Sequence, residues 1–172
     1  KHEHYNVTKK KNLGKRGIRR VAKSYKFHPQ YVPGINEMDV CVLNLNDDMI
    51  GLDILPISIC LTPWNVDENL TFFGWGHFTR NETIANHNFV LQTSTIPIVP
   101  ESVCNERWWK LSYTICAGTE EKYATYGDTG GPAICNGSLC GLISYIEDQY
   151  KMARFTDVCS KPIYDFITDE IK

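Results

Sequence analysis

The stretch Tyr126-Gly127-Asp128-Thr129-Gly130-Gly131-Pro132 decides the fold of this 172-residue chain. Its glycines tolerate backbone angles that other residues rarely adopt, as a tight, specialised loop requires. Short apolar runs separated by turn residues lie on both sides of it, which predicts an all-β sandwich or barrel in one domain. These runs are Val40–Leu45, Thr71–Trp75, Phe89–Ile98, Tyr113–Ala117, Leu139–Tyr145 and Ala153–Thr156.

One pair of these runs is joined by a hairpin signal. Asn136-Gly137-Ser138 predicts a tight turn centred on Gly137-Ser138. In that hairpin Cys135 faces Cys140, and a non-hydrogen-bonded pair has Cα atoms about 4.5 Å apart. This separation is within disulfide range, so we expect these two cysteines to be bonded.

The chain ends in one expected helix. Ser160 can cap it, and Pro162 lies in the first turn, where a missing N–H costs little. Ile163, Phe166, Ile167 and Ile171 then follow at helical spacing and form one apolar stripe. We therefore expect many strands followed by a terminal helix that packs on them.

The cysteines and sequons indicate an oxidising, secreted context. The chain has 7 cysteines, and four N-glycosylation sequons begin at Asn6, Asn69, Asn81 and Asn136. Structural zinc needs closely paired ligands, and the only close pair, Cys135 and Cys140, fits zinc spacing poorly. We therefore expect no metal, and we expect no cofactor. We also expect no membrane span, because no segment has the ~18–20 consecutive apolar residues that a span needs. No charged-then-apolar leader opens the sequence, so we expect that it is not a precursor beginning at its signal peptide.

The charges are segregated along the chain. Residues 1–26 hold ten Lys/Arg and one acid, a net charge of +9, so with a total of −2 the remainder carries −11. The favoured interpretation of this basic block is a solvated strand face. The alternative is an anion-binding patch for glycosaminoglycan, phospholipid or an acidic protein; nucleic acid is not an expected partner. The patch would be formed by Lys9, Lys10, Lys11, Arg16, Arg19 and Arg20.

Several motifs together carry a family resemblance. With serine in place of Thr129, the central loop would read GDSGGP, the nucleophile loop of chymotrypsin-like proteases. Further segments resemble that family's aspartate strand, its GWG turn, the strand after that turn, its ICAG segment, its substrate-lining strand and its C-terminal ending. In order, they are Glu37–Leu45, Phe73–Gly76, Leu91-Gln92 with Ile96–Val99, Ile115–Gly118, Leu142–Tyr145, and Phe155–Cys159 with the helix after it. From about residue 20 to its end, the chain resembles the trypsin/chymotrypsin family, most closely its secreted invertebrate members.

The resemblance implies a fold and a domain plan. The fold is a chymotrypsin-like double β-barrel with an incomplete N-terminal barrel and a C-terminal helix. The whole chain, 1–172, would be a single serine-protease-like domain. Residues 1–65 would be the remainder of the first barrel, 66–160 the second barrel, and 161–172 the helix.

The resemblance also implies catalytic positions, with departures. Asp39 is the triad aspartate, Thr129 stands at the nucleophile position, and the backbone N–H groups of Gly127 and Thr129 form the oxyanion hole. A hydroxyl is a poor nucleophile without an adjacent base. None of the five histidines matches the general base, and His28 resembles part of a surface segment. The other four are His2, His4, His77 and His87.

The specificity pocket implied by the resemblance is altered. It would be lined by Tyr123, Ala124, Ser144, Tyr145 and Ile146. Trypsin-like members have Asp where Tyr123 stands, and the family usually has glycine where Ile146 stands. These two side chains would largely fill the pocket, and no carboxylate is placed to receive Arg or Lys.

The resemblance implies disulfide pairs as well. Cys104 and Cys116 match a conventional family pair, and Cys60–Cys159 is the plausible second. Because the usual partner of Cys135 is absent, Cys140 is its local substitute. Cys41 is then left over, as a buried free thiol or a cysteine whose partner is lost.

Three functions remain open. The first is a catalytically deficient serine-protease homologue that acts by binding protein. The second is a partial chain of an active secreted endopeptidase, because about three strands of the first barrel are missing and open strand edges invite aggregation. The third is the anion-binding module described above.

Overall fold

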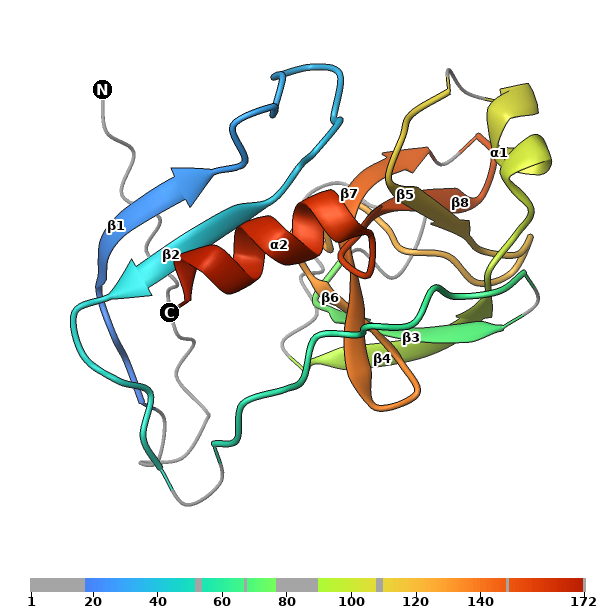
Figure 1. Ribbon diagram of the computed structural model, residues 1–172. Helices are drawn as coiled ribbons and strands as arrows, with labels where there is room; N and C mark the ends of the chain where they lie inside the picture. The colour runs from blue at the N-terminus through green and yellow to red at the C-terminus, as the bar shows by residue number, and fades with distance from the viewer. Residues whose placement is uncertain are drawn as a thin grey trace.

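The computed structural model describes residues 18–51, 54–66, 68–76, 90–107, 110–147 and 149–171. Its strands form a two-stranded sheet, β1-β2, and a six-stranded sheet in the order β4-β3-β6-β7-β8-β5. Two helices accompany them, and Figure 1 shows the longer one, α2, running beside β2 toward the six-stranded sheet. The bounds are β1 Ala22–Phe27, β2 Cys41–Leu45, β3 Asn69–Gly74, β4 Gln92–Pro97, α1 Glu101–Arg107, β5 Thr114–Ala117, β6 Pro132–Cys135, β7 Ser138–Glu147, β8 Met152–Asp157 and α2 Lys161–Glu170.

The β1-β2 ribbon has little core of its own. The two strands are antiparallel, with Phe27 opposite Cys41 and Ala22 opposite Leu45. All six residues of β1 are exposed, and Leu43 on β2 is 58% exposed. A two-stranded ribbon is marginally stable alone, so its position depends on what packs beside it.

The six-stranded sheet encloses the main core. Its strands pair antiparallel throughout the described ladder. Apolar side chains from all six strands meet in one cluster, in which Phe155, Leu70 and Ile143 are at most 1% exposed. The alternation of buried and exposed residues along β3 is what a sheet with one covered face produces.

Helix α2 joins the two sheets. Ile163 and Phe166 are buried in a cluster with Met38, Val40 and Val158, which come from the approach to β2 and the end of β8. At the exposed side of this contact, Lys26 on β1 and Glu170 on α2 form an ion pair at 2.5 Å. The helix therefore anchors the ribbon to the rest of the domain.

Two details of the predicted helix are wrong. The Ser160 hydroxyl makes no side-chain cap, because it donates instead to the carbonyl oxygen of Asp157 at 2.6 Å. Ile171 is 61% exposed, because the helix ends at Glu170 and this residue no longer lies on the packed face.

The predicted register of the cysteine hairpin is also wrong. The turn is Asn136-Gly137, so Cys135 pairs with Ser138 rather than with Cys140. An irregularity between Ala133 and Ile134 shifts the ladder and brings Cys140 to the disulfide position. Three disulfides are formed, and they join the expected pairs: Cys60–Cys159, Cys104–Cys116 and Cys135–Cys140. Cys41 is a free thiol.

Candidate functional site

Asp39 is held against the six-stranded sheet by two hydroxyl groups. Ser144 on β7 donates through Oγ to the Asp39 carboxylate at 2.6 Å. Thr156 on β8 donates through Oγ1 to the Asp39 carbonyl oxygen at 2.8 Å. The structure thus brings together two of the predicted site residues, Asp39 and Ser144, from segments far apart in the sequence.

The loop around Thr129 is built on a buried carboxylate. Asp128 is 6% exposed. Its side chain accepts hydrogen bonds from the Gly76 N–H at 2.7 Å, the Thr125 N–H at 2.9 Å and the Thr125 hydroxyl at 3.3 Å. A Cβ atom on Gly76 would lie 2.6 Å from the carboxylate. This close approach explains why the Gly74-Trp75-Gly76 turn needs glycine.

Backbone hydrogen bonds attach the same loop to β7. The Gly130 N–H donates to the Ile143 carbonyl oxygen at 2.7 Å, and the Ile143 N–H donates to the Gly131 carbonyl oxygen at 2.9 Å. Gly127 and Gly130 have φ of 97° and 84°, angles at which a side chain is strained. Gly127 and Thr129 lie exposed at the tip of the loop. Among the described residues the Thr129 hydroxyl has no hydrogen-bond partner.

His28 does not lie on the surface, which corrects the sequence-based expectation. It is 7% exposed, because α2 covers it and its ring stands edge-on to Phe166 with the centroids 5.0 Å apart. Its Nδ1 atom accepts a hydrogen bond from the Gln30 N–H at 3.2 Å. His28 is thus engaged in packing. His2, His4, His77 and His87 lie outside the described residues.

The residues of the predicted specificity pocket contribute largely to the core. Ile146 is 5% exposed and belongs to the same buried cluster as Ala124 and Ala153. Ile146 faces Ala153 across the β7-β8 ladder. Ser144 is 8% exposed, and Tyr123 and Tyr145 are half-buried. The Ile146 side chain therefore occupies space inside the barrel.

The remaining predicted sites fall only partly within the described chain. Arg20 donates through Nε to the Asp48 carbonyl oxygen at 2.8 Å, while Arg19 is exposed; Lys9, Lys10, Lys11 and Arg16 lie outside the described residues. The sequon residues Asn69 and Asn136 are exposed, and Asn6 and Asn81 lie outside the described residues.

Over the described ranges, no group of three or more potential ligands could hold a metal. No helix in those ranges is long and apolar enough to span a bilayer.

Two residues contribute to this geometry without having been predicted from the sequence. Thr125 supplies two of the three donors to Asp128, and Thr156 fixes the Asp39 backbone. A threonine three residues before an aspartate in a glycine-rich loop is compatible with such a contact. Nothing in the sequence around Thr156 signals its bond to Asp39, because the two residues are 117 positions apart.

The antiparallel sheets, the aspartate fixed by a serine and the loop built on Asp128 define a serine-protease-like domain. The sequence model of the trypsin family matches residues 2–166, and the chain belongs to that family. Seminase of Drosophila melanogaster is 30% identical over 139 residues, covering 77% of this chain and 50% of that protein. The thrombin-like enzyme cerastocytin of Cerastes cerastes is 31% identical over 150 residues, covering 83% and 54%.

One more relative and one solved structure are also similar to the chain. Snake venom serine protease homolog 2A of Craspedocephalus gramineus is 36% identical over 97 residues, covering 54% of this chain and 36% of that protein. Mouse neuropsin, a solved structure, superposes with a TM-score of 0.79 at 21% identity, covering 89% of this chain and 72% of that one. This likeness confirms the predicted chymotrypsin-like fold. The chain spans about half the length of the curated relatives named first, and the division near residue 65 stays a prediction.

Proposed function

We propose that the domain formed by this chain is a catalytically deficient serine-protease homologue that acts by binding protein. The observation that carries the proposal is the setting of Thr129. Its exposed hydroxyl has no hydrogen-bond partner among the described residues. The Asp39 carboxylate has only the Ser144 hydroxyl as a side-chain partner in the same part of the chain. A hydroxyl without an adjacent base is a poor nucleophile.

The altered specificity pocket supports the same proposal. Ile146 lies in the core beside Ala124, so little room remains for a substrate side chain. The β-branched Thr129 adds a methyl group and restricts χ1 where the family has serine. Triad members act as a unit, so the loss of one removes most of their joint effect. In this proposal Asp39, Gly127 and Thr129 keep the family geometry without its turnover.

The test uses the complete gene product with a fluorophosphonate probe and a broad panel of peptides. We expect no labelling at residue 129 and no turnover in the wild type. The matched controls are Thr129→Ala, which removes the hydroxyl, and Thr129→Ser, which restores the family nucleophile. Labelling of the wild type that Thr129→Ala abolishes would refute the proposal. Labelling of Thr129→Ser alone would show that threonine is the disabling feature and that a base is present.

A second candidate is an active secreted endopeptidase of which this chain is a part. The exposed β1-β2 ribbon favours it, because Tyr25 and Phe27 are 59% and 51% exposed in a family whose fold is a closed barrel. Reading the transcript upstream of Lys1 separates the two candidates. A segment encoding a histidine-bearing strand would support the enzyme, and turnover by the resulting protein would establish it.

Two finer properties remain proposals as well. Three disulfides and the exposed sequon residues Asn69 and Asn136 support a secreted glycoprotein. A mass shift on glycosidase treatment would test this. For the anion-binding alternative, we expect retention on heparin at physiological salt to be lost when Lys9–Lys11 and Arg19–Arg20 are neutralised. Flow-through of the wild type would dismiss it.

A further inference from the structure

A hollow of about 210 Å³ lies beside the Asp39 segment. Its lining residues are Gln30, Glu37, Met38 and Tyr113. The first three come from the segment between β1 and β2, and Tyr113 comes from the approach to β5. Sites for drug-sized ligands occupy about 300–1,000 Å³. This hollow is therefore large enough for one long side chain and too small for a bulky ligand.

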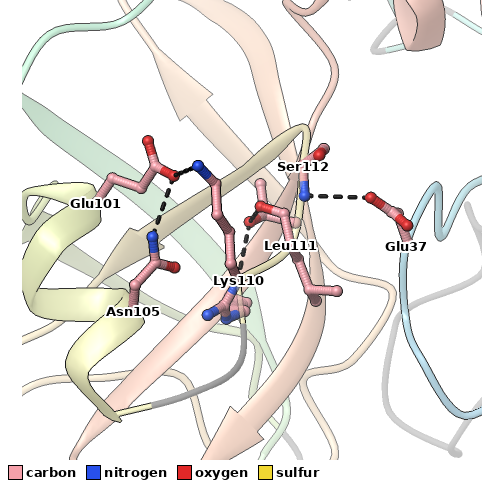
Figure 2. Close-up of polar contacts among 8 residues, drawn as sticks. Glu37, Glu101, Asn105, Lys110, Leu111 and Ser112 are labelled. Atoms are coloured by element: carbon pink, nitrogen blue, oxygen red, sulfur yellow. Dashed lines mark hydrogen bonds and ion pairs between the residues drawn. The ribbon is translucent and has the colours of Figure 1, made fainter.

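The hollow is negatively charged. The Glu37 carboxylate accepts one hydrogen bond, from the Ser112 N–H at 3.2 Å, which bridges the two loops (Figure 2). Neither Glu37 nor the nearby Asp39 has an ion-pair partner among the described residues. Lys110, the cation labelled in Figure 2, is paired with Glu101 instead. Burial, and after it the charge of Asp39, raises the pKa of Tyr31 next to Gln30.

The backbone around the hollow adopts unusual angles. Asn36, Met38 and Tyr113 have φ of 59°, 51° and 57°, in the left-handed region. Such a conformation is unfavourable for a non-glycine residue and persists only where the surroundings impose it. The lining is thus a defined surface, with the 6% exposed Met38 beneath and the 41% exposed Tyr113 at the rim.

We propose that this hollow receives a lysine or arginine side chain of a protein partner. The Glu37 carboxylate supplies the opposite charge, the Tyr113 ring offers a face for a cation–π contact, and the Met38 thioether packs against the methylene stem. An anionic group would be repelled by Glu37 and Asp39, and an apolar side chain would desolvate the Glu37 carboxylate without supplying an opposite charge. The proposal deepens the protein-binding function and rests on it.

The test is to titrate Nα-acetyl-arginine amide or Nα-acetyl-lysine amide into the isotopically labelled protein. Binding is monitored through the amide chemical shifts. We expect saturable shifts at Glu37, Met38 and Tyr113 and weaker binding in Glu37→Gln, by about three- to fivefold, as for loss of one partly exposed ion pair. The glutamine retains an acceptor for the Ser112 N–H, so the loop connection is kept. Asp47→Asn, which removes an exposed charge on the turn after β2, is the matched control and should bind as the wild type does.

Neutral Nε-acetyl-lysine and anionic Nα-acetyl-glutamate amide are the comparison probes. Equal shifts with either of them, no shifts at the lining residues, or undiminished binding in Glu37→Gln would overturn the proposal. Shifts centred on Tyr123 would place the cation in the specificity pocket and overturn it too. Labelling at Thr129 with intact binding at Met38 would overturn only the non-catalytic function, so the two failures are distinguishable.

Discussion

Replacing Asp128 by alanine perturbs the contact that shapes the Thr129 loop. The carboxylate is 6% exposed and accepts from Gly76 N–H, Thr125 N–H and the Thr125 hydroxyl, at 2.7, 2.9 and 3.3 Å. None of these donors carries a charge, so within the described part of the chain Asp128 is stabilised by hydrogen bonds and not by an ion pair. Alanine leaves all three donors facing a small void.

The expected cost follows from the donors left unsatisfied. Each buried N–H that loses its acceptor costs about 1–3 kcal/mol, and two backbone N–H groups are affected. The hydroxyl can rotate to another acceptor, and water entering the void recovers part of the loss. We therefore expect Asp128→Ala to lower the free energy of unfolding by roughly 2–5 kcal/mol.

Urea denaturation measures this free energy from the midpoint and the slope. Thr125→Val removes the hydroxyl but keeps the N–H donor, so we expect a smaller loss of about 1 kcal/mol. Thr125→Ser keeps both donors and is the matched control, with stability near that of the wild type. Hydrogen exchange at the amides of Gly76 and Gly130 should be slowest in Thr125→Ser, faster in Thr125→Val and fastest in Asp128→Ala.

A free energy of unfolding for Asp128→Ala within about 0.5 kcal/mol of the wild type, the range of ordinary surface substitutions, would contradict this role of Asp128. Equal stabilities of Thr125→Val and Thr125→Ser would contradict it too, since the hydroxyl would then contribute nothing to the carboxylate.

Three further outcomes are expected. Burial raises the pKa of the Cys41 thiol, so iodoacetamide should modify the native protein slowly near pH 8. After denaturation without reductant, a thiol assay should find one free thiol per chain. Two or more free thiols would contradict the disulfide pairing. Burial, partly offset by hydrogen bonds from Trp64 and Cys159, raises the pKa of Asp157 above 3.8. Its stabilising contribution is therefore full below pH 3.8 and lost as pH rises through the raised value. In the wild type the free energy of unfolding should thus contain a term that falls with rising pH in the acid range, and Asp157→Asn should lack that term. Ile163→Ala should cost about 2–5 kcal/mol in urea denaturation, because Ile163 is fully buried on the packed face of α2; a loss below 1 kcal/mol would contradict that packing.

Local sequence patterns predicted those strands of the six-stranded sheet whose own sequences are rich in apolar residues. Thr71–Trp75 and Ala153–Thr156 lie close to β3 and β8, because burial leaves an apolar signal in each strand: every second residue of β3 is buried, and five consecutive residues of β8 are buried. β1 gave no such signal, since its sequence AKSYKF is mixed and all of it is exposed. The short helix α1 was missed because seven residues give too few turns for a periodic pattern.

The motifs predicted where Asp39 and the Thr129 loop would lie, but not their contacts. The burial of His28 depends on Phe166 of α2, which no local pattern connects to it. The bond from Ser144 to Asp39 joins residues 105 positions apart. The register of the cysteine hairpin differed because the irregularity between Ala133 and Ile134 has no distinct residue signature. Long-range packing therefore set the parts of the site that sequence patterns could not.

The disulfide between Cys60 and Cys159 spans 99 positions of the chain. A protease that cuts once anywhere between these two cysteines would leave both fragments covalently connected. Such a nicked molecule would migrate as one species without reductant and as two with it. By the loop-entropy account, closing a loop of about 100 residues is worth nearly 5 kcal/mol. A single cut between Cys60 and Cys159 would thus leave the two sheets in one covalently connected molecule.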